Sequence, residues 1–379
     1  MGNKIKKIAL IAGEASGDKI GADLIKKLSL SYKIEIFGIG GEELSTHGLK
    51  SLFPYDELSL IGPWAILKNI KELNKKLKLT IKSIITYKPD ILIIIDSPEF
   101  THRVAKNIKK YFPNLPIINY VPPLVWVWRS YRARLMKKYI TYILSIYPFE
   151  PKIFRELGGP PSIYIGNPLF DNIKKRESPK IINSSETKTI LFMPGSRQSE
   201  IDKLLKPSFD SFKYMSSKGY KFKIKIPTFY KYKAKLEKCI GAYDLDFEII
   251  LDEEEKIKCF YSADLALVAS GSATLELSAA KLPMVVIYKL NLLNSVFAFI
   301  LHLHKRSISL PNLILKKNLV PELIQKDCNA LNISKNLIEL FDNETKRNNQ
   351  LKGFNEIHEI MKTSNSEEEL NNLFNTYLS

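Results

Sequence analysis

A carboxylate stands at the end of an unbroken apolar run in the first half of the chain. Residues 91–95 are all Ile or Leu, and Asp96 follows them directly, with Ser97 and Pro98 behind it. Ligands of parallel sheets bind at the carboxyl ends of the strands, so an aspartate here can face a ligand-binding cleft. The structural alternative is that Asp96 caps a following helix or starts a turn. Position alone leaves both interpretations open.

Two later turns carry groups suited to phosphate. In MPGSR, residues 193–197, Gly195 and Ser196 make a turn after an apolar run, and Arg197 is suited to bidentate phosphate contact. In ASGSATLE, residues 269–276, small residues open a helix, and they are Gly271, Ser272, Ala273 and Thr274. Backbone N–H groups at such a helix start can hold a diphosphate, and Glu276 is a candidate for ribose hydroxyls. Ordinary N-capping is the alternative for both turns.

The N-terminal turn AGEASGD, residues 12–18, is a further polar site. Gly13 permits a tight turn, and Glu14 follows it with a carboxylate side chain. Ser16 and Asp18 are good N-cap residues, and the pattern predicts a helix over residues 18–30. The turn is neither a complete G-x-G-x-x-G fingerprint nor a P-loop. Glycine used only for packing is therefore the competing interpretation.

The segment 61–87 predicts a basic amphipathic helix. Apolar residues recur at spacings of three and four and lysines occupy much of the rest, which is the pattern of a helix that lies on an anionic membrane. For residues 77–85 we favour packing on a sheet instead. For the first turns we favour contact with a membrane or a lipid-binding groove, and the residues concerned are Trp64, Ile66, Leu67 and Ile70.

The elements that must position these groups alternate between apolar strands and helices. The predicted strands are 7–13, 33–41, 90–95, 115–121, 140–148 and 162–168, then 189–196, 221–227, 247–252, 264–270 and 284–289. Such alternation predicts an α/β fold with two doubly wound Rossmann-like domains and a cleft between them. We expect domains over 1–170 and 188–345, a linker over 171–187, and C-terminal helices over 346–379 that pack back on the first domain or are exchanged in a dimer.

The composition narrows the class of protein. The 379 residues carry a net charge of +17, which indicates an anionic partner unless it is compositional drift. Three scattered cysteines predict neither a disulfide framework nor a zinc site. We read the D-x-D at Asp244 and Asp246 as a solvated loop, so no metal or other cofactor is expected. No signal peptide or membrane span is visible, which predicts a cytoplasmic protein.

Taken together and in order, these motifs resemble one family. The motifs are AGEASGD, IDSPEF, YVPPLVWVWR, YPFE, MPGSR, ASGSATLE, MVVIYK and SLPNLI, and they span most of the chain. The ordered set resembles the lipid-A-disaccharide synthases. That resemblance implies a glycosyltransferase B-type fold and transfer from UDP-2,3-diacylglucosamine to 2,3-diacylglucosamine 1-phosphate, giving the β-1,6-linked lipid A disaccharide 1-phosphate and UDP. It also implies a homodimer and peripheral attachment to the inner face of the cytoplasmic membrane.

The resemblance also assigns roles. Asp96 would be the general base of an inverting displacement, and Arg197 would stabilise charge on departing UDP. Asn312 would contact the donor or its diphosphate, and Glu14 and Ser16 would face the sugar. The chain departs from the family at Pro122 and at Asn167, where the family usually has Ser and His.

Two other functions remain alternatives. A UDP-N-acetylglucosamine 2-epimerase can share the fold. It would need further acid and base residues in the cleft, and it would have no need of an apolar surface for lipid. A basic nucleic-acid-binding protein would interleave aromatic and basic residues on one platform. The lysines here are instead scattered along the chain, so we expect no nucleic-acid partner.

Overall fold

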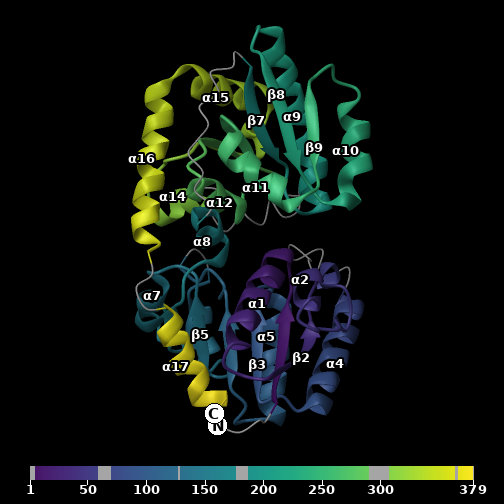
Figure 1. The fold of residues 1–379 in the computed structure, drawn as a ribbon, viewed down its shortest axis with the longest axis vertical. Coiled ribbons are helices and arrows are strands. Elements are labelled where there is room, and N and C mark those ends of the chain that lie inside the picture. Colours follow the sequence, from purple (N-terminus) through teal and green to yellow (C-terminus); the bar gives the residue numbers. More distant parts are fainter. Residues whose placement is uncertain are drawn as a thin grey trace. The chain divides into compact units, whose positions relative to one another are not determined.

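The computed structural model describes residues 5–58, 70–126, 129–175, 187–289, 307–362 and 366–378. It divides into two compact units. Unit 1 comprises residues 1–168 and 361–379, and unit 2 comprises residues 169–360. Each unit has its own sheet and its own helices (Figure 1).

Unit 1 is built on a six-stranded parallel sheet in the order β2-β1-β3-β4-β5-β6. Its strands are β1 (Lys6–Ala12), β2 (Ile34–Ile39), β3 (Ile91–Ile95), β4 (Ile117–Tyr120), β5 (Tyr142–Ser145) and β6 (Ser162–Tyr164). Its helices are α1 (Ala15–Leu28), α2 (Glu42–Ser45), η1 (Tyr55–Leu58), α4 (Ile70–Tyr87), α5 (Pro98–Tyr111), α6 (Tyr131–Met136), α7 (Glu150–Glu156) and α17 (Ser366–Leu378). Every residue of β3 is buried, because helices cover both faces of a parallel sheet.

Unit 2 repeats this architecture with the order β12-β11-β10-β7-β8-β9, again all parallel. Its strands are β7 (Lys188–Met193), β8 (Phe222–Pro227), β9 (Phe247–Ile250), β10 (Leu265–Ala269), β11 (Met284–Tyr288) and β12 (Glu322–Ile324). Its helices are α8 (Pro168–Lys175), α9 (Gln198–Ser217), η2 (Tyr230–Tyr232), α10 (Lys233–Ile240), α11 (Glu253–Ser262), α12 (Ala273–Ala279), α14 (Leu310–Leu315), η4 (Gln325–Asp327), α15 (Ala330–Asp342) and α16 (Glu344–Ile360). The predicted fold class, α/β with two doubly wound domains, is confirmed.

Each sheet reverses its winding direction once, next to its first strand. In unit 1 the chain places β2 on one side of β1 and β3 on the other, and in unit 2 it places β8 and β10 on opposite sides of β7. Such a switch point opens a crevice at the carboxyl ends of the two strands concerned. The loop with Glu14 and the turn with Asp96 lie at the first switch point. The turns with Arg197 and Gly271 lie at the second.

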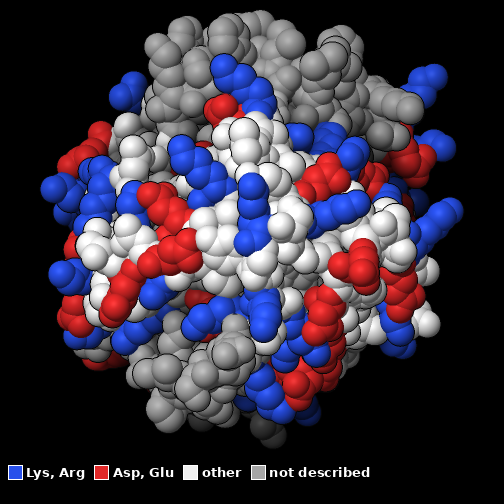
Figure 2. All heavy atoms as spheres, turned by 90° about the horizontal axis from the view of Figure 1, so that it is seen from above, with Lys and Arg blue, Asp and Glu red and all other residues white. Residues whose placement is uncertain are grey.

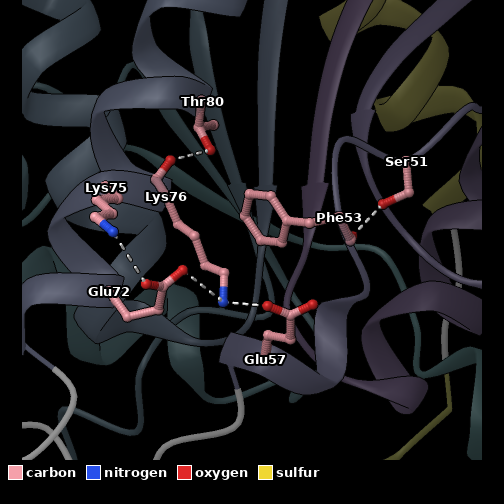
Figure 3. Close-up of polar contacts among 7 residues, drawn as sticks. All are labelled: Ser51, Phe53, Glu57, Glu72, Lys75, Lys76 and Thr80. Carbon is pink, nitrogen blue, oxygen red and sulfur yellow. Dashed lines mark hydrogen bonds and ion pairs between the residues drawn. The ribbon is translucent and has the colours of Figure 1, made fainter.

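The basic helix α4 packs on the core of unit 1. Leu73 and Ile84 are buried in this core, and Leu77 and Ile81 are partly buried against it. The prediction that residues 77–85 pack on a sheet is therefore confirmed. Figure 3 shows Lys76 between two carboxylates, in an ion pair with Glu57 on η1 and 3.8 Å from Glu72. Lys76 also lies over the ring of Phe53 at 5.6 Å. This lysine therefore ties α4 to the preceding segment.

Some predicted boundaries shift. The helix expected from residue 18 begins at Ala15, and α8 occupies the start of the predicted linker, whose residues 176–186 lie outside the described part of the chain. The C-terminal helices divide between the units, because α16 belongs to unit 2 and α17 to unit 1. Within unit 1, α17 buries Phe374 completely, and the Tyr164 hydroxyl donates to the Met361 carbonyl at 2.8 Å.

The surface charges are mixed. On the face drawn in Figure 2, Lys and Arg side chains alternate with Asp and Glu side chains over the described residues. The described residues of this face therefore form no continuous basic platform of the kind that single-stranded nucleic acid needs. Within the described helices, none combines the length and apolar character of a membrane span.

Candidate active site

Asp96 occupies a strained turn between β3 and α5. Asp96 and Ser97 both have left-handed backbones, with φ of 55° and 43°, a conformation uncommon for residues other than glycine. The Asp96 side chain accepts from its neighbour's amide, Ser97 N, at 2.7 Å, and the Thr101 hydroxyl donates to the Asp96 carbonyl at 2.8 Å. The N-cap residue of α5 is Ser97. The turn therefore holds the half-buried Asp96 carboxylate at the strand end, and Asp96 itself is not the helix cap.

The loop after β1 lies directly against this turn. Gly13 N donates to the Ile95 carbonyl at 3.4 Å, and a Cβ on Gly13 would lie 2.1 Å from the Ser97 hydroxyl. Glycine is therefore required at position 13 by close approach. The contact brings the half-buried Glu14 and Ser16 to the same end of the sheet as Asp96.

The predicted capping role of Asp18 in its own helix is wrong. Asp18 lies inside α1, is 3% exposed, and accepts from Gly41 N at 2.7 Å and from Glu43 N at 3.0 Å. It thus caps α2, a long-range contact that no local pattern in the sequence reveals. The N-cap residue of α1 is Glu14, whose side chain makes no capping hydrogen bond.

Unit 1 also contains a buried carboxyl group that sequence reasoning missed. Glu150, the first residue of α7, is fully buried and accepts from Trp126 Nε1 and from Tyr147 N, both at 3.3 Å. Burial raises the pKa of Glu150 to about 8, against the effect of these hydrogen bonds. Burial also raises the pKa of Tyr147, and the charges of Glu150 and Asp96 add to that rise. Tyr147 is therefore close enough to both carboxyl groups to feel their charges. The YPFE motif, a carboxylate after an aromatic pair, was the available signal.

Glu150 gives the chain a testable pH dependence. Its pKa in the folded state, about 8, exceeds the ordinary value of 4.5, so the protonated form stabilises the fold. That stabilisation is complete below about pH 4.5 and is lost as the pH rises to about 8. When the pH is raised from 5 to 8, the native chain is expected to lose on the order of 3 kcal/mol of unfolding free energy relative to Glu150→Gln, because Gln does not titrate. Urea unfolding of both proteins at the two pH values measures this, and parallel pH dependence would contradict it.

In unit 2, Arg197 is oriented by Glu200. Arg197 is the extended N-cap residue of α9, and its Nη1 donates to Glu200 Oε1 at 3.0 Å. Gly195 has a left-handed φ of 109°, and a Cβ there would meet Glu200 Oε2 at 2.5 Å. The Ser196 carbonyl accepts from the Tyr232 hydroxyl at 3.1 Å. The turn after β7 is thus fixed in shape, with the partly exposed Arg197 guanidinium at its end.

The turn after β10 is open on one side. Gly271 and Ser272 are exposed, and an added Cβ on Gly271 would meet nothing within 4 Å. The buried Thr274 fixes the turn, because its hydroxyl donates to the Gly271 carbonyl at 2.8 Å. Ala273 begins α12, and the Glu276 carboxylate lies 3.8 Å from the Lys256 ammonium group. The exposed backbone of this turn is therefore accessible to a ligand.

Asn312 does not point to a ligand. Its Nδ2 donates to the Val320 carbonyl at 2.9 Å and to Glu322 Oε1 at 2.8 Å. Its Oδ1 accepts from Leu319 N at 2.8 Å and from Val320 N at 2.9 Å. The amide is thus fully used within the fold and is 2% exposed. The predicted contact of Asn312 with the donor is therefore replaced by a structural role, in which Asn312 positions the neighbouring segments.

That role connects two motifs. Glu322 also accepts from Ser309 N at 2.9 Å and so holds the SLPN segment. The segment in turn joins the turn after β10, because Ser270 Oγ donates to the Ile308 carbonyl at 2.8 Å. Asn312 and Glu322 therefore support the open turn from behind.

The remaining predicted residues lie elsewhere or outside the described chain. The predicted membrane contacts Trp64, Ile66 and Leu67 are outside it, as is the side chain of Ile70 at the start of α4. Asn167, where the family usually has His, is 3% exposed. The D-x-D aspartates are both exposed in the loop before β9, in agreement with the predicted solvated loop. The structure thus brings Glu14, Ser16 and Asp96 to one edge of unit 1, and the turns of Arg197 and Gly271 to one edge of unit 2.

Comparison with known proteins identifies the family. A family model described as lipid-A-disaccharide synthetase matches residues 8–373. The lipid-A-disaccharide synthase of Nitrobacter winogradskyi is 36% identical over 95% of this chain and 92% of its own length, and that of Francisella philomiragia is 37% identical over 94% and 95%. The chain belongs to the lipid-A-disaccharide synthase family. It is therefore a UDP-sugar-dependent glycosyltransferase of lipid A biosynthesis.

Solved structures resemble this family member in fold. MnaA of S. aureus, solved with UDP, gives a TM-score of 0.68 at 17% identity and covers 98% of this chain and 97% of its own. The UDP-GlcNAc 2-epimerase of Neisseria meningitidis, bound to UDP-GlcNAc, gives a TM-score of 0.63 at 13% identity and covers 98% of this chain and 99% of its own. The calicheamicin glycosyltransferase CalG4 gives a TM-score of 0.61 at 11% identity and covers 99% of this chain and 98% of its own. At these identities the likeness concerns the fold alone.

Proposed function

We propose that this chain transfers the sugar of UDP-2,3-diacylglucosamine to 2,3-diacylglucosamine 1-phosphate in a single displacement with inversion. The observation that carries the proposal is the position of Asp96, in a strained turn at the carboxyl end of β3 and at the switch point of unit 1. Strained backbone persists where the surrounding structure enforces it, and it is concentrated at functional sites. The specific substrates come from the family resemblance.

Asp96 acts as the general base. The acceptor hydroxyl oxygen attacks the anomeric carbon on the face opposite to UDP, and Asp96 takes the hydroxyl proton as the new bond forms. The bond from the anomeric carbon to the diphosphate breaks, and its electron pair leaves on UDP. One base is enough for a single displacement. Glu14, on the neighbouring loop, and Ser16, in the first turn of α1, face the sugar.

Unit 2 holds the donor. Arg197, oriented by Glu200, stabilises the negative charge that develops on the departing diphosphate. The turns Gly195–Ser196 and Gly271–Thr274 contact the diphosphate through their backbone N–H groups. Glu276 binds the ribose hydroxyls. We assign acceptor binding to unit 1, whose switch point carries Asp96.

Gly271 provides a direct test of the donor site. Gly271→Ala is expected to leave the melting temperature unchanged, since the added Cβ contacts nothing within 4 Å. It is expected to weaken UDP binding by about tenfold, because the methyl group occupies space that the diphosphate needs to reach the backbone. Calorimetric titration with UDP measures the effect, and uridine, which lacks phosphate, is the control. Equal affinities for UDP in the two proteins would remove Gly271 from the site.

We also propose that the enzyme acts at the inner face of the cytoplasmic membrane, as a homodimer, with the segment Trp64–Ile70 as the membrane contact. The support is the basic, apolar character of this segment and the acyl chains of both substrates. Co-sedimentation with anionic vesicles, with Trp64→Ser as the comparison, tests the contact. Equal sedimentation of the two proteins would argue against it.

The reaction itself is tested by UDP release from UDP-2,3-diacylglucosamine in the presence and absence of the acceptor. We expect UDP release to depend on the acceptor and to match the disaccharide 1-phosphate formed. Epimerisation of UDP-N-acetylglucosamine by the same preparation, without disaccharide formation, would favour the epimerase alternative. UDP release that is independent of the acceptor would contradict the proposed transfer.

A further inference from the structure

A pocket beside the Asp96 turn belongs wholly to unit 1 and is lined by none of the residues assigned above to catalysis or donor binding. Its volume is about 210 Å³. It begins at Pro98 and Glu99, immediately after the Asp96 turn, and follows one side of α5. The opposite wall is formed by Pro123, which follows β4 in the sequence, by residues of α6, and by Tyr139 after that helix. Because β3 and β4 are adjacent parallel strands, the mouth of the pocket lies at the same sheet edge as Asp96.

The lining of the pocket is positively charged. Among the described residues that line it, Arg103, Lys106 and Arg132 are cations and Glu99 is the one carboxylate. Arg132 hydrogen-bonds Glu99, and Arg129 Nη1 lies 3.6 Å from the same carboxylate. Partial burial raises the pKa of Glu99, but the hydrogen bond and charge of Arg132, with the charges of Arg129 and Arg103, outweigh it and lower that pKa. Cations therefore remain in excess around the pocket even with Glu99 ionised.

The floor of the pocket is preorganised. His102 is 8% exposed, and its Nδ1 lies 2.9 Å from the Tyr139 hydroxyl. Burial, together with the charges of Arg132 and Lys106, lowers the pKa of His102 to about 3. The imidazole is therefore neutral, and the positive potential comes from the Arg and Lys side chains. Lys106 Nζ is also held over the Tyr139 ring, 5.1 Å from its centroid.

The rim of the pocket is apolar. Tyr131 is 60% exposed and Leu135 is 42% exposed, and both line the pocket beside Arg132. Exposed large apolar groups next to clustered cations match a ligand with both an anionic group and a hydrocarbon part. A small water-soluble anion would gain nothing from this rim.

We propose that this pocket binds the phosphate monoester of the lipid acceptor, with the phosphate on Arg103 and Lys106 and an acyl chain against Tyr131 and Leu135. The inference rests on the proposed function for the identity of the acceptor. A phosphate monoester carries close to two negative charges at neutral pH, which suits the excess of cations. Along α5, Arg103 lies five residues beyond Pro98, or roughly 8 Å. In the proposed complex, one sugar ring extends from a phosphate held here to a hydroxyl group at Asp96.

The test uses Arg103→Gln combined with Lys106→Gln. The control with the same charge change is Lys110→Gln combined with Lys138→Gln, two exposed lysines that do not line the pocket. Transfer is measured with 2,3-diacylglucosamine 1-phosphate and with the same lipid lacking phosphate. We expect the pocket variant to lower kcat/KM for the phosphorylated acceptor by about 10²-fold, with donor KM unchanged. The rate with the phosphate-free acceptor should stay at its native value, and the control should match the native chain for both acceptors.

Two results would overturn the proposal. Equal losses for both acceptors would mean that the cations do not recognise the acceptor phosphate. Unchanged acceptor kinetics, with weaker binding to vesicles of anionic phospholipid, would assign the pocket to a membrane headgroup instead. Calorimetric binding of the acceptor without donor separates this proposal from the transfer reaction. Phosphate-dependent binding that the pocket variant loses would support the pocket even if no transfer occurred.

Discussion

Replacement of Asp96 by Asn is expected to reduce turnover by about 10²-fold or more, with the donor still bound at native affinity. Asn has nearly the same shape as Asp but cannot accept the proton of the attacking hydroxyl group. The amide oxygen of Asn can still accept the 2.7 Å hydrogen bond from Ser97 N, so the strained turn should survive. Single-turnover UDP release, together with UDP titration and thermal melting, measures the effect.

The surrounding carboxylates supply the controls for Asp96. Glu99 is engaged by Arg132 and has a lowered pKa, so it is a poor proton acceptor. Glu14 lies on the adjacent loop and is the other nearby base by type. Glu99→Gln should therefore retain far more activity than Asp96→Asn. Turnover that survived in Asp96→Asn would make Asp96 structural and direct attention to Glu14.

Replacement of Arg197 by Gln is expected to lower kcat by about 10²- to 10³-fold. The guanidinium group is the charged donor of the β7 turn, and loss of one donor that stabilises developing negative charge typically has an effect of this size. Because the interaction grows as UDP departs, kcat should fall more than donor affinity. Steady-state kinetics with saturating acceptor, with UDP affinity measured separately, checks both expectations.

Glu200→Gln is the matched control for Arg197. It removes the charge that orients Arg197 through the 3.0 Å ion pair, and it keeps a side chain of similar size against Gly195. The guanidinium group remains present, so we expect a loss well below that of Arg197→Gln. If the two variants lost activity equally, charge stabilisation by Arg197 would not be the cause. Arg197 would then act only by holding the turn.

The repeating pattern of apolar strands was enough to predict both sheets except for β12, a three-residue strand at the edge of the second sheet. Strands buried on both faces are apolar along their whole length, and that property is visible locally, as in residues 91–95. The edge at which Asp96 lies follows from the same pattern, because parallel strands all end at one side. The predicted helix start at Asp18 was wrong, because the role of this residue depends on a distant segment and not on its local sequence. Asp18 serves the N-terminus of α2, and a contact between distant segments leaves no local signal.

The candidate site shows the same limit. The family resemblance assigned Asn312 to the donor or its diphosphate, but its four hydrogen bonds go to residues 319–322. Glu150 looks like an ordinary helix start, and only its contact with Trp126 shows that the carboxyl group is buried. The cationic pocket likewise joins α5 to α6, which are separate in sequence. Residue type predicted chemistry at strand ends, whereas burial and pairing required the structure.

The configuration of the newly formed glycosidic bond tests the central claim most directly, which is that Asp96 serves as the base in a single displacement. The native chain is allowed to convert the α-linked UDP donor and the acceptor, and the anomeric coupling in the purified disaccharide is measured by NMR. We predict a β linkage, formed by attack opposite to the departing UDP. An α linkage would contradict the account, since retention requires a second displacement that a lone base at Asp96 does not provide.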